Sequence, residues 1–259
     1  ETLLPTIYRC DPQTRRRHAI AREWLQVVLQ LWCDNRFRFV NDRGWRNYRL
    51  DTTEVNTIAQ HYQIGTKLID WTWDPAIAVC FAADGTCDES VETPSSRVLL
   101  RTVPRESKEQ VLLPPAFATR IWHQRGLFQE HDDPASNDRV RRDWPGLADM
   151  SASRSSVSSY PSIIFSCSSE EKAAASETIR HLLDPDDPLR MLSNWALETT
   201  SALEEPPSKG LRLLPSWDGF KQELPACQAE EFAKILDASN PIEEDVETMV
   251  SYVDQVALR

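Results

Sequence analysis

Residues 60–75, QHYQIGTKLIDWTWDP, bring together side chains that can bind a ligand or move a proton. A free imidazole has a pKa of about 6.5, so the histidine can exchange a proton near neutral pH. The aromatic rings can stack on a planar group, and the hydroxyl and carboxylate oxygens can form hydrogen bonds. Polar groups that converge between two helices are what a binding pocket is made from. The stretch therefore predicts the floor of a pocket, with candidate residues His61, Tyr62, Thr66, Asp70, Trp71 and Thr72.

The same side chains also have a structural interpretation. Asp74 can cap the helix that Pro75 begins, Thr66 can be a turn residue, and His61 suits the last turn of a helix. The tryptophans can belong to a core. Buried polar groups are usually satisfied by structural partners. However, one core rarely needs so many polar groups at once, so the pocket interpretation is kept beside the structural one.

Three helices should position this stretch. Residues 18–35 carry apolar side chains at spacings of three and four, which line one face of a helix. Residues 52–62 follow Asp51, and Glu54 lies three residues after that aspartate, which is the spacing of a capping box and predicts a second helix. Residues 75–84 are apolar on all sides, which predicts a short buried helix.

Strands and loops fill the rest of the first 185 residues. The segment PTIYRCD alternates with period two and predicts a short strand, as do residues 97–103 and 162–168. Residues 85–96 should be a loop, and the polar residues 132–161 a long loop or insertion.

Beyond residue 168 the sequence predicts helices, two of them within residues 226–257. The fold class expected is α+β, with a small twisted, mainly antiparallel sheet flanked by helices and a helical C-terminal appendage. The expected domains are 1–185 and an acidic helical extension, 186–259.

Charge narrows the kinds of partner. The chain has 29 basic and 40 acidic residues, a net charge of −11, yet residues 1–50 hold ten arginines and five acidic residues. This overall acidity argues against direct binding of nucleic acid, which needs an extended cationic face. The basic first part could still meet a compact anion such as a nucleotide, and the acidic tail could dock to a protein partner.

The six cysteines are scattered without a C-x-x-C pair, which predicts reduced thiols, a cytoplasmic location and no metal site. No window is long and apolar enough for a membrane-spanning helix.

Three segments together resemble the signature blocks of the FRG domain family. They are IYRC at 7–10, QHYQIGTKLIDWTWDPAIAVCFAAD at 60–84 and RIWHQRGLFQEH at 120–131. The residues that match the blocks are Arg9, His61, Tyr62, Thr66, Asp70, Trp71, Thr72 and Gln124. The family has Gly, Gly, Pro and Arg where this chain has Cys10, Gln63, Gly65 and Lys67.

The resemblance implies a protein from a defence or toxin-like context. The order of parts is also similar to that of ADP-ribosyltransferases, which implies NAD as the cofactor and an ADP-ribosyltransferase or NAD glycohydrolase as the enzyme. In that interpretation Arg9 holds phosphate, Tyr62 stacks, Thr66 and Thr72 bond the ribose or amide, and His61 orients the ligand or exchanges a proton. Asp70 and Trp71 join the cofactor site, and Gln124 or Glu130 faces the ribose.

A second hypothesis belongs to a different class of protein. The same pocket would bind a nucleotide or a protein segment without catalysis, as a sensor or interaction module. Both hypotheses require Arg9, Tyr62 and Gln124, which lie far apart in the sequence, to meet in space.

Overall fold

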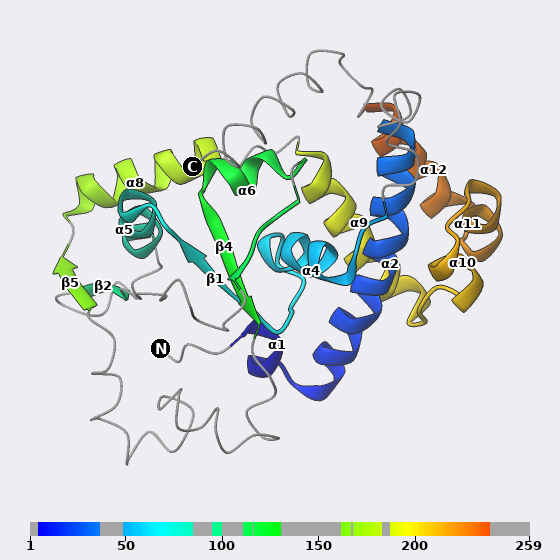
Figure 1. The fold of residues 1–259 in the computed structure, drawn as a ribbon, viewed down its shortest axis with the longest axis horizontal. Coiled ribbons are helices and arrows are strands. Elements are labelled where there is room, and N and C mark those ends of the chain that lie inside the picture. The colour runs from blue at the N-terminus through cyan, green and yellow to red at the C-terminus, as the bar shows by residue number, and fades with distance from the viewer. Residues whose placement is uncertain are drawn as a thin grey trace. The chain divides into compact units, whose positions relative to one another are not determined.

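A computed structural model describes residues 5–36, 49–84, 95–99, 111–115, 117–130, 162–166, 168–182 and 187–238 (Figure 1). The chain divides into two compact units. The first consists of Glu1–Tyr8, Lys67–Leu113 and Thr119–Pro185, and the second of Arg9–Thr66, Pro114–Ala118 and Asp186–Arg259. The division into domains 1–185 and 186–259 stays a prediction.

The first unit contains the strands. In one antiparallel sheet, β4 (Gly126–Glu130) lies between β1 (Leu68–Thr72) and β3 (Val111–Leu112). A second antiparallel pair joins β2 (Ser95–Leu99) to β5 (Ser162–Ser166). The expected α+β fold class with a small, mainly antiparallel sheet is therefore confirmed.

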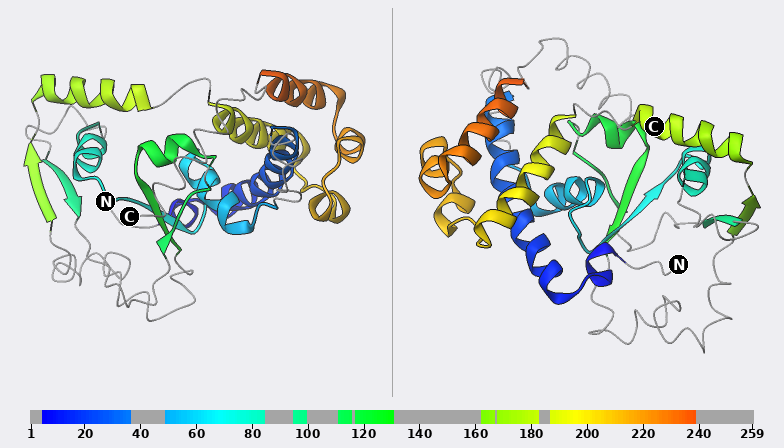
Figure 2. Two further views of the ribbon diagram at one scale, coloured as in Figure 1. Left: turned by 45° about the horizontal axis from the view of Figure 1, so that its top comes forward. Right: turned by 180° about the vertical axis from the view of Figure 1, so that it is seen from behind.

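Besides α1 (Thr6–Arg9), most of which belongs to this unit, three helices lie in its described part. They are α5 (Pro75–Asp84), α6 (Thr119–His123) and α8 (Ser169–Leu182). Helices α5 and α8 run side by side in the views of Figures 1 and 2. The prediction that α5 is buried is wrong, because Val79 and Phe81 are exposed and, among the residues of α5 whose burial is described, only Ala83 is buried. A helix of ten residues that is apolar all round has more apolar surface than its contacts with α8, β2 and β1 cover.

The second unit is helical. Its axis is α2 (Pro12–Arg36), which extends the predicted helix 18–35 by one and a half turns or so at its start. Against α2 pack α4 (Thr52–His61), α9 (Pro188–Leu203), α10 (Lys209–Leu213) and α12 (Ala226–Ala238), and α11 (Trp217–Glu223) packs on α12 (Figures 1 and 2). One of the two helices predicted in 226–257 is thus confirmed as α12, and the other lies outside the described residues.

An aromatic cluster forms the core of this unit. Trp24 of α2 meets Trp195 of α9 edge-on, with ring centroids 6.2 Å apart, and Phe220 of α11 at 6.5 Å. Phe232 of α12 lies 4.8 Å from Phe220. Such pairs contribute about 0.5–1.5 kcal/mol each beyond their buried area. The helices that follow residue 186 therefore share one core with α2.

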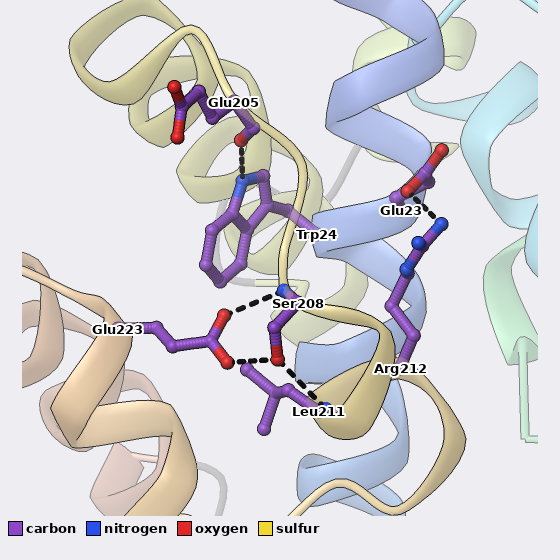
Figure 3. A network of polar contacts seen from close by, with 7 residues as sticks. All are labelled: Glu23, Trp24, Glu205, Ser208, Leu211, Arg212 and Glu223. Atoms are coloured by element: carbon purple, nitrogen blue, oxygen red, sulfur yellow. Dashed lines mark hydrogen bonds and ion pairs between the residues drawn. The ribbon is translucent and has the colours of Figure 1, made fainter.

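Polar contacts fix the segment that leads from α9 to α11 (Figure 3). The indole N–H of Trp24 donates to the carbonyl of Glu205 at 2.8 Å. Ser208 caps α10 by accepting from the Leu211 N–H, and the Glu223 carboxylate accepts from both the backbone N–H and the hydroxyl of Ser208. This segment is thus tied to α2 as well as to α11.

The predicted strand at PTIYRCD is wrong, because residues Thr6–Arg9 form a single helical turn, α1. The Tyr8 N–H donates to the Pro5 carbonyl at 3.0 Å, so this part of the backbone bonds locally. A strand needs hydrogen bonds from a neighbouring strand, and an alternation only four residues long fits one turn of helix as well. Of the loop predicted at 85–96, residues 85–94 lie outside the described residues, and its end is wrong because Ser95 and Ser96 belong to β2. The insertion predicted at 132–161 and the end of the strand predicted at 97–103 also lie outside the described residues.

Candidate functional site

Helix α4 brings His61 and Tyr62 to its C-terminal end. The predicted capping box is confirmed: the Asp51 carboxylate accepts from the Glu54 N–H, and the Glu54 carboxylate accepts from the Asp51 N–H. The rings of His61 and Tyr62 meet edge-on, with centroids 4.9 Å apart. Tyr62 is only 5% exposed.

The hydroxyl of Tyr62 donates to the carboxylate of Asp187, another buried residue. The second oxygen of that carboxylate accepts from the Leu189 N–H at 2.9 Å and caps the start of α9. A hydrogen bond to a charged group contributes about 1.5–3 kcal/mol. Tyr62 therefore fastens α4 to the start of α9.

A tight turn links Tyr62 to Thr66. The Ile64 N–H donates to the Ala59 carbonyl at 2.8 Å, and the Thr66 hydroxyl donates to the Gln60 side chain at 2.8 Å. Gln63 has φ 69°, in the left-handed region that favours glycine. Glycine is the residue that the FRG block has at this position, so the turn explains that glycine in physical terms. Thr66 is fully buried within the turn.

His18 of α2 holds the same turn. Its Nδ1 accepts from the Gly65 N–H at 3.0 Å. The FRG block has proline here, and proline has no N–H, so this bond depends on the glycine of this chain. Burial, and then the charges of Arg22 and Arg17, lower the pKa of His18 below its ordinary value of 6.5. The neutral imidazole, which can accept this bond, is the favoured form.

In the first unit, the end of β1 and the start of β4 form a bonded corner. We call residues 72–74 with residues 124–125 the Thr72 corner. The Thr72 hydroxyl donates to the Gln124 carbonyl at 3.0 Å and accepts from the Asp74 N–H at 3.1 Å. Asp74 caps α5 through the Ala76 N–H at 2.9 Å, and its other oxygen lies 3.4 Å from Nε of Arg125. The predicted Asp74 cap is thus confirmed.

Gln124 is the buried polar residue of this corner. It is 4% exposed, and its Nε2 atom has no hydrogen-bond partner in the part of the chain that the structure describes. Its backbone is fixed at both ends, since its N–H donates to the Arg120 carbonyl at 3.1 Å and its carbonyl accepts from Thr72. A buried donor without an acceptor costs about 1–3 kcal/mol. An acceptor from a bound molecule would remove that cost.

The other predicted residues of the first unit lie along the sheet. Asp70 is exposed and pairs in register with Phe128, and Trp71 with Leu127. Glu130 is exposed and pairs with Leu68 at the opposite end of β4 from the Thr72 corner. At a rise of about 3.4 Å per residue, four steps along β4 carry Glu130 about 14 Å from Gly126. The two alternatives for the residue that faces the ribose are therefore well separated: Gln124 lies in the turn before β4, and Glu130 is the last residue of that strand.

The predicted site residues fall into both units. Arg9, which is exposed, belongs to the second unit with His61, Tyr62 and Thr66. Thr72 and Gln124 are brought together in the first unit. The meeting of the two sets of residues in one pocket stays a prediction.

Sequence reasoning did not single out three residues that the structure places in these contacts. They are His18, Arg125 and Asp187. Arg125 sits inside the QRG block, and its φ of 51° marks a turn. Asp187 precedes a proline, which is a signal for a helix cap but not for its tyrosine partner.

The described residues contain no group of three or more His, Cys, Asp or Glu side chains that could hold a metal ion. None of their helices combines the length and the apolar character needed to cross a membrane.

Comparison with known proteins supports the family resemblance. The described residues make an α+β protein with a polar corner at the edge of a small antiparallel sheet. Residues 2–90 match the family model of the FRG domain, so the chain contains an FRG domain. No curated protein and no solved structure matches the chain.

Proposed function

We propose that this FRG-domain protein binds a nucleotide, with NAD as the first candidate, and that the Thr72 corner supplies part of the site. The observation that carries the proposal is the buried Nε2 of Gln124, which has no acceptor among the described residues. Sugar hydroxyls, phosphate oxygens and amide carbonyls of a nucleotide are all acceptors for such a donor.

Charge at the corner supports an anionic ligand. The Arg125 side chain is half exposed, at 50%, and its Nε lies 3.4 Å from the Asp74 carboxylate. Its terminal nitrogens can bond phosphate as a fork.

The geometry of the first unit supports binding more than catalysis. Transfer of ADP-ribose needs an anion near the ribose, where positive charge develops in the transition state. Asp74 is engaged as the cap of α5, and Glu130 lies at the far end of β4. The non-catalytic form of the proposal is therefore preferred, and the ADP-ribosyltransferase is its alternative.

A titration of the full chain with NAD and ADP-ribose tests the proposal. Gln124→Met keeps the size of the side chain but removes the donor, so the dissociation constant should rise about tenfold, the value of one hydrogen bond of about 1.4 kcal/mol. The midpoint of thermal unfolding without ligand should stay the same or rise, because a buried unmatched donor is removed. Gln222→Met, at an exposed position of α11, is the matched control.

Two results would overturn the proposal. Absence of any thermal shift with both ligands at millimolar concentration would refute nucleotide binding. Cleavage of NAD to nicotinamide by the wild type, lost in both Arg9→Ala and Glu130→Gln, would show that the protein is an enzyme and refute the non-catalytic form of the proposal.

A further inference from the structure

Trp73 is exposed although the backbone around it is firmly bonded. It is 43% exposed, while its N–H donates to the Arg125 carbonyl at 3.4 Å. Thr72 and Asp74, its neighbours in sequence, make the hydrogen bonds of the Thr72 corner. A large aromatic side chain on a fixed backbone is a ready surface for a planar group.

The ring of Trp73 is also supported from one side. The buried Trp122 of α6 lies next to it, with ring centroids 6.4 Å apart and an angle of 55° between the planes. Such support restricts the motion of the exposed indole, so little conformational freedom is left to lose when a ligand covers it. The exposed indole, the buried amide of Gln124 and the guanidinium of Arg125 belong to the two bonded segments of the Thr72 corner.

We propose that Trp73 stacks on the base of the bound nucleotide. This inference rests on the proposed function and narrows its preferred ligand class to molecules that carry a planar base, which should bind more tightly than sugar phosphates without a base. Stacking on an aromatic side chain accepts any base, because each base has a π face. Selection among bases would then come from the donor of Gln124.

The test compares ligands with and without a base on the full chain, by calorimetry with adenosine monophosphate and ribose 5-phosphate. Wild-type protein should bind adenosine monophosphate more tightly by about 5- to 150-fold, the range that stacking of one base gives. Trp73→Ala should lose this advantage, and Trp73→Phe should keep most of it. Both variants should leave the binding of ribose 5-phosphate unchanged.

Phe81→Ala is the matched control, since Phe81 is an aromatic residue of α5 with the same exposed fraction, 43%. It should bind adenosine monophosphate like the wild type, and circular dichroism should show the same helix content in all variants. An equal effect of Trp73→Ala and Phe81→Ala would refute the stacking role.

The two proposals fail in different ways. One possible result is that adenosine monophosphate and ribose 5-phosphate bind equally well, that Trp73→Ala has no effect, and that Gln124→Met weakens the binding of both ligands. In that case the stacking inference is wrong and the proposed function stands. If no nucleotide binds the wild type at all, the proposed function is wrong and the stacking inference falls with it.

Discussion

Removal of the Tyr62 hydroxyl should destabilise the second unit. Tyr62→Phe keeps the ring but leaves one oxygen of the buried Asp187 carboxylate without its donor. A hydrogen bond to a charged group contributes about 1.5–3 kcal/mol, so unfolding should become easier by that amount. For a chain of this size, 1 kcal/mol shifts the midpoint of thermal unfolding by about 2–4 °C, which gives an expected decrease of about 3–12 °C.

Urea unfolding followed by circular dichroism measures the effect, and a double-mutant cycle with Asp187→Asn assigns it to this pair. The asparagine side chain still offers an oxygen to the Leu189 N–H and so preserves the cap of α9. The coupling energy between the two substitutions should be about 1–3 kcal/mol. A Tyr62→Phe protein within about 0.5 kcal/mol of the wild type would refute the role given to this hydroxyl.

Three further substitutions test local features. Since the pKa of His18 is lowered in the folded protein, the free energy of unfolding should fall as the pH drops below 6.5 toward that pKa. In His18→Gln, whose side chain can still accept from the Gly65 N–H but does not titrate there, the free energy of unfolding should depend less steeply on pH. The same pH dependence for both proteins in urea titrations would contradict this. Gly126→Ala would place a Cβ 2.8 Å from Cγ2 of Ile121 and should cost about 1–3 kcal/mol in the same assay, and a neutral effect would count against this close contact. Gln63→Gly should stabilise by about 0.5 kcal/mol by relieving a positive φ, which a lower urea midpoint would disprove.

Local signals in the sequence were sufficient for the helices near the candidate site. Asp51 with Glu54, and Asp74 with Pro75, begin α4 and α5 as predicted, because caps act within three residues of the chain. The apolar spacing of residues 18–35 likewise predicted α2.

The sheet was harder to predict. Strand β3 has two residues, and β1 and β4 have five each, so their alternation is too short to separate a strand from a turn. The same weakness made a helical turn at Thr6–Arg9 look like a strand. Pairing partners also lie far apart in sequence, as Thr72 and Gly126 do, and one sequence gives no direct sign of register.

The contacts of the candidate site explain why the motif residues alone do not define it. The FRG match covers residues 2–90, yet Thr72 is held by Gln124 and Tyr62 by Asp187, both beyond the match. The matched residues 2–90 thus supply one member of each bonded pair, and later parts of the chain, which include the third block with Gln124, supply the other. Because a buried polar group without its partner costs free energy, the geometry of the FRG residues depends on these later segments. A hydroxyl or an amide in this domain can therefore be assigned to ligand binding only after its structural partner is known, and by that criterion the amide of Gln124 is the stronger candidate and the hydroxyl of Tyr62 the weaker one.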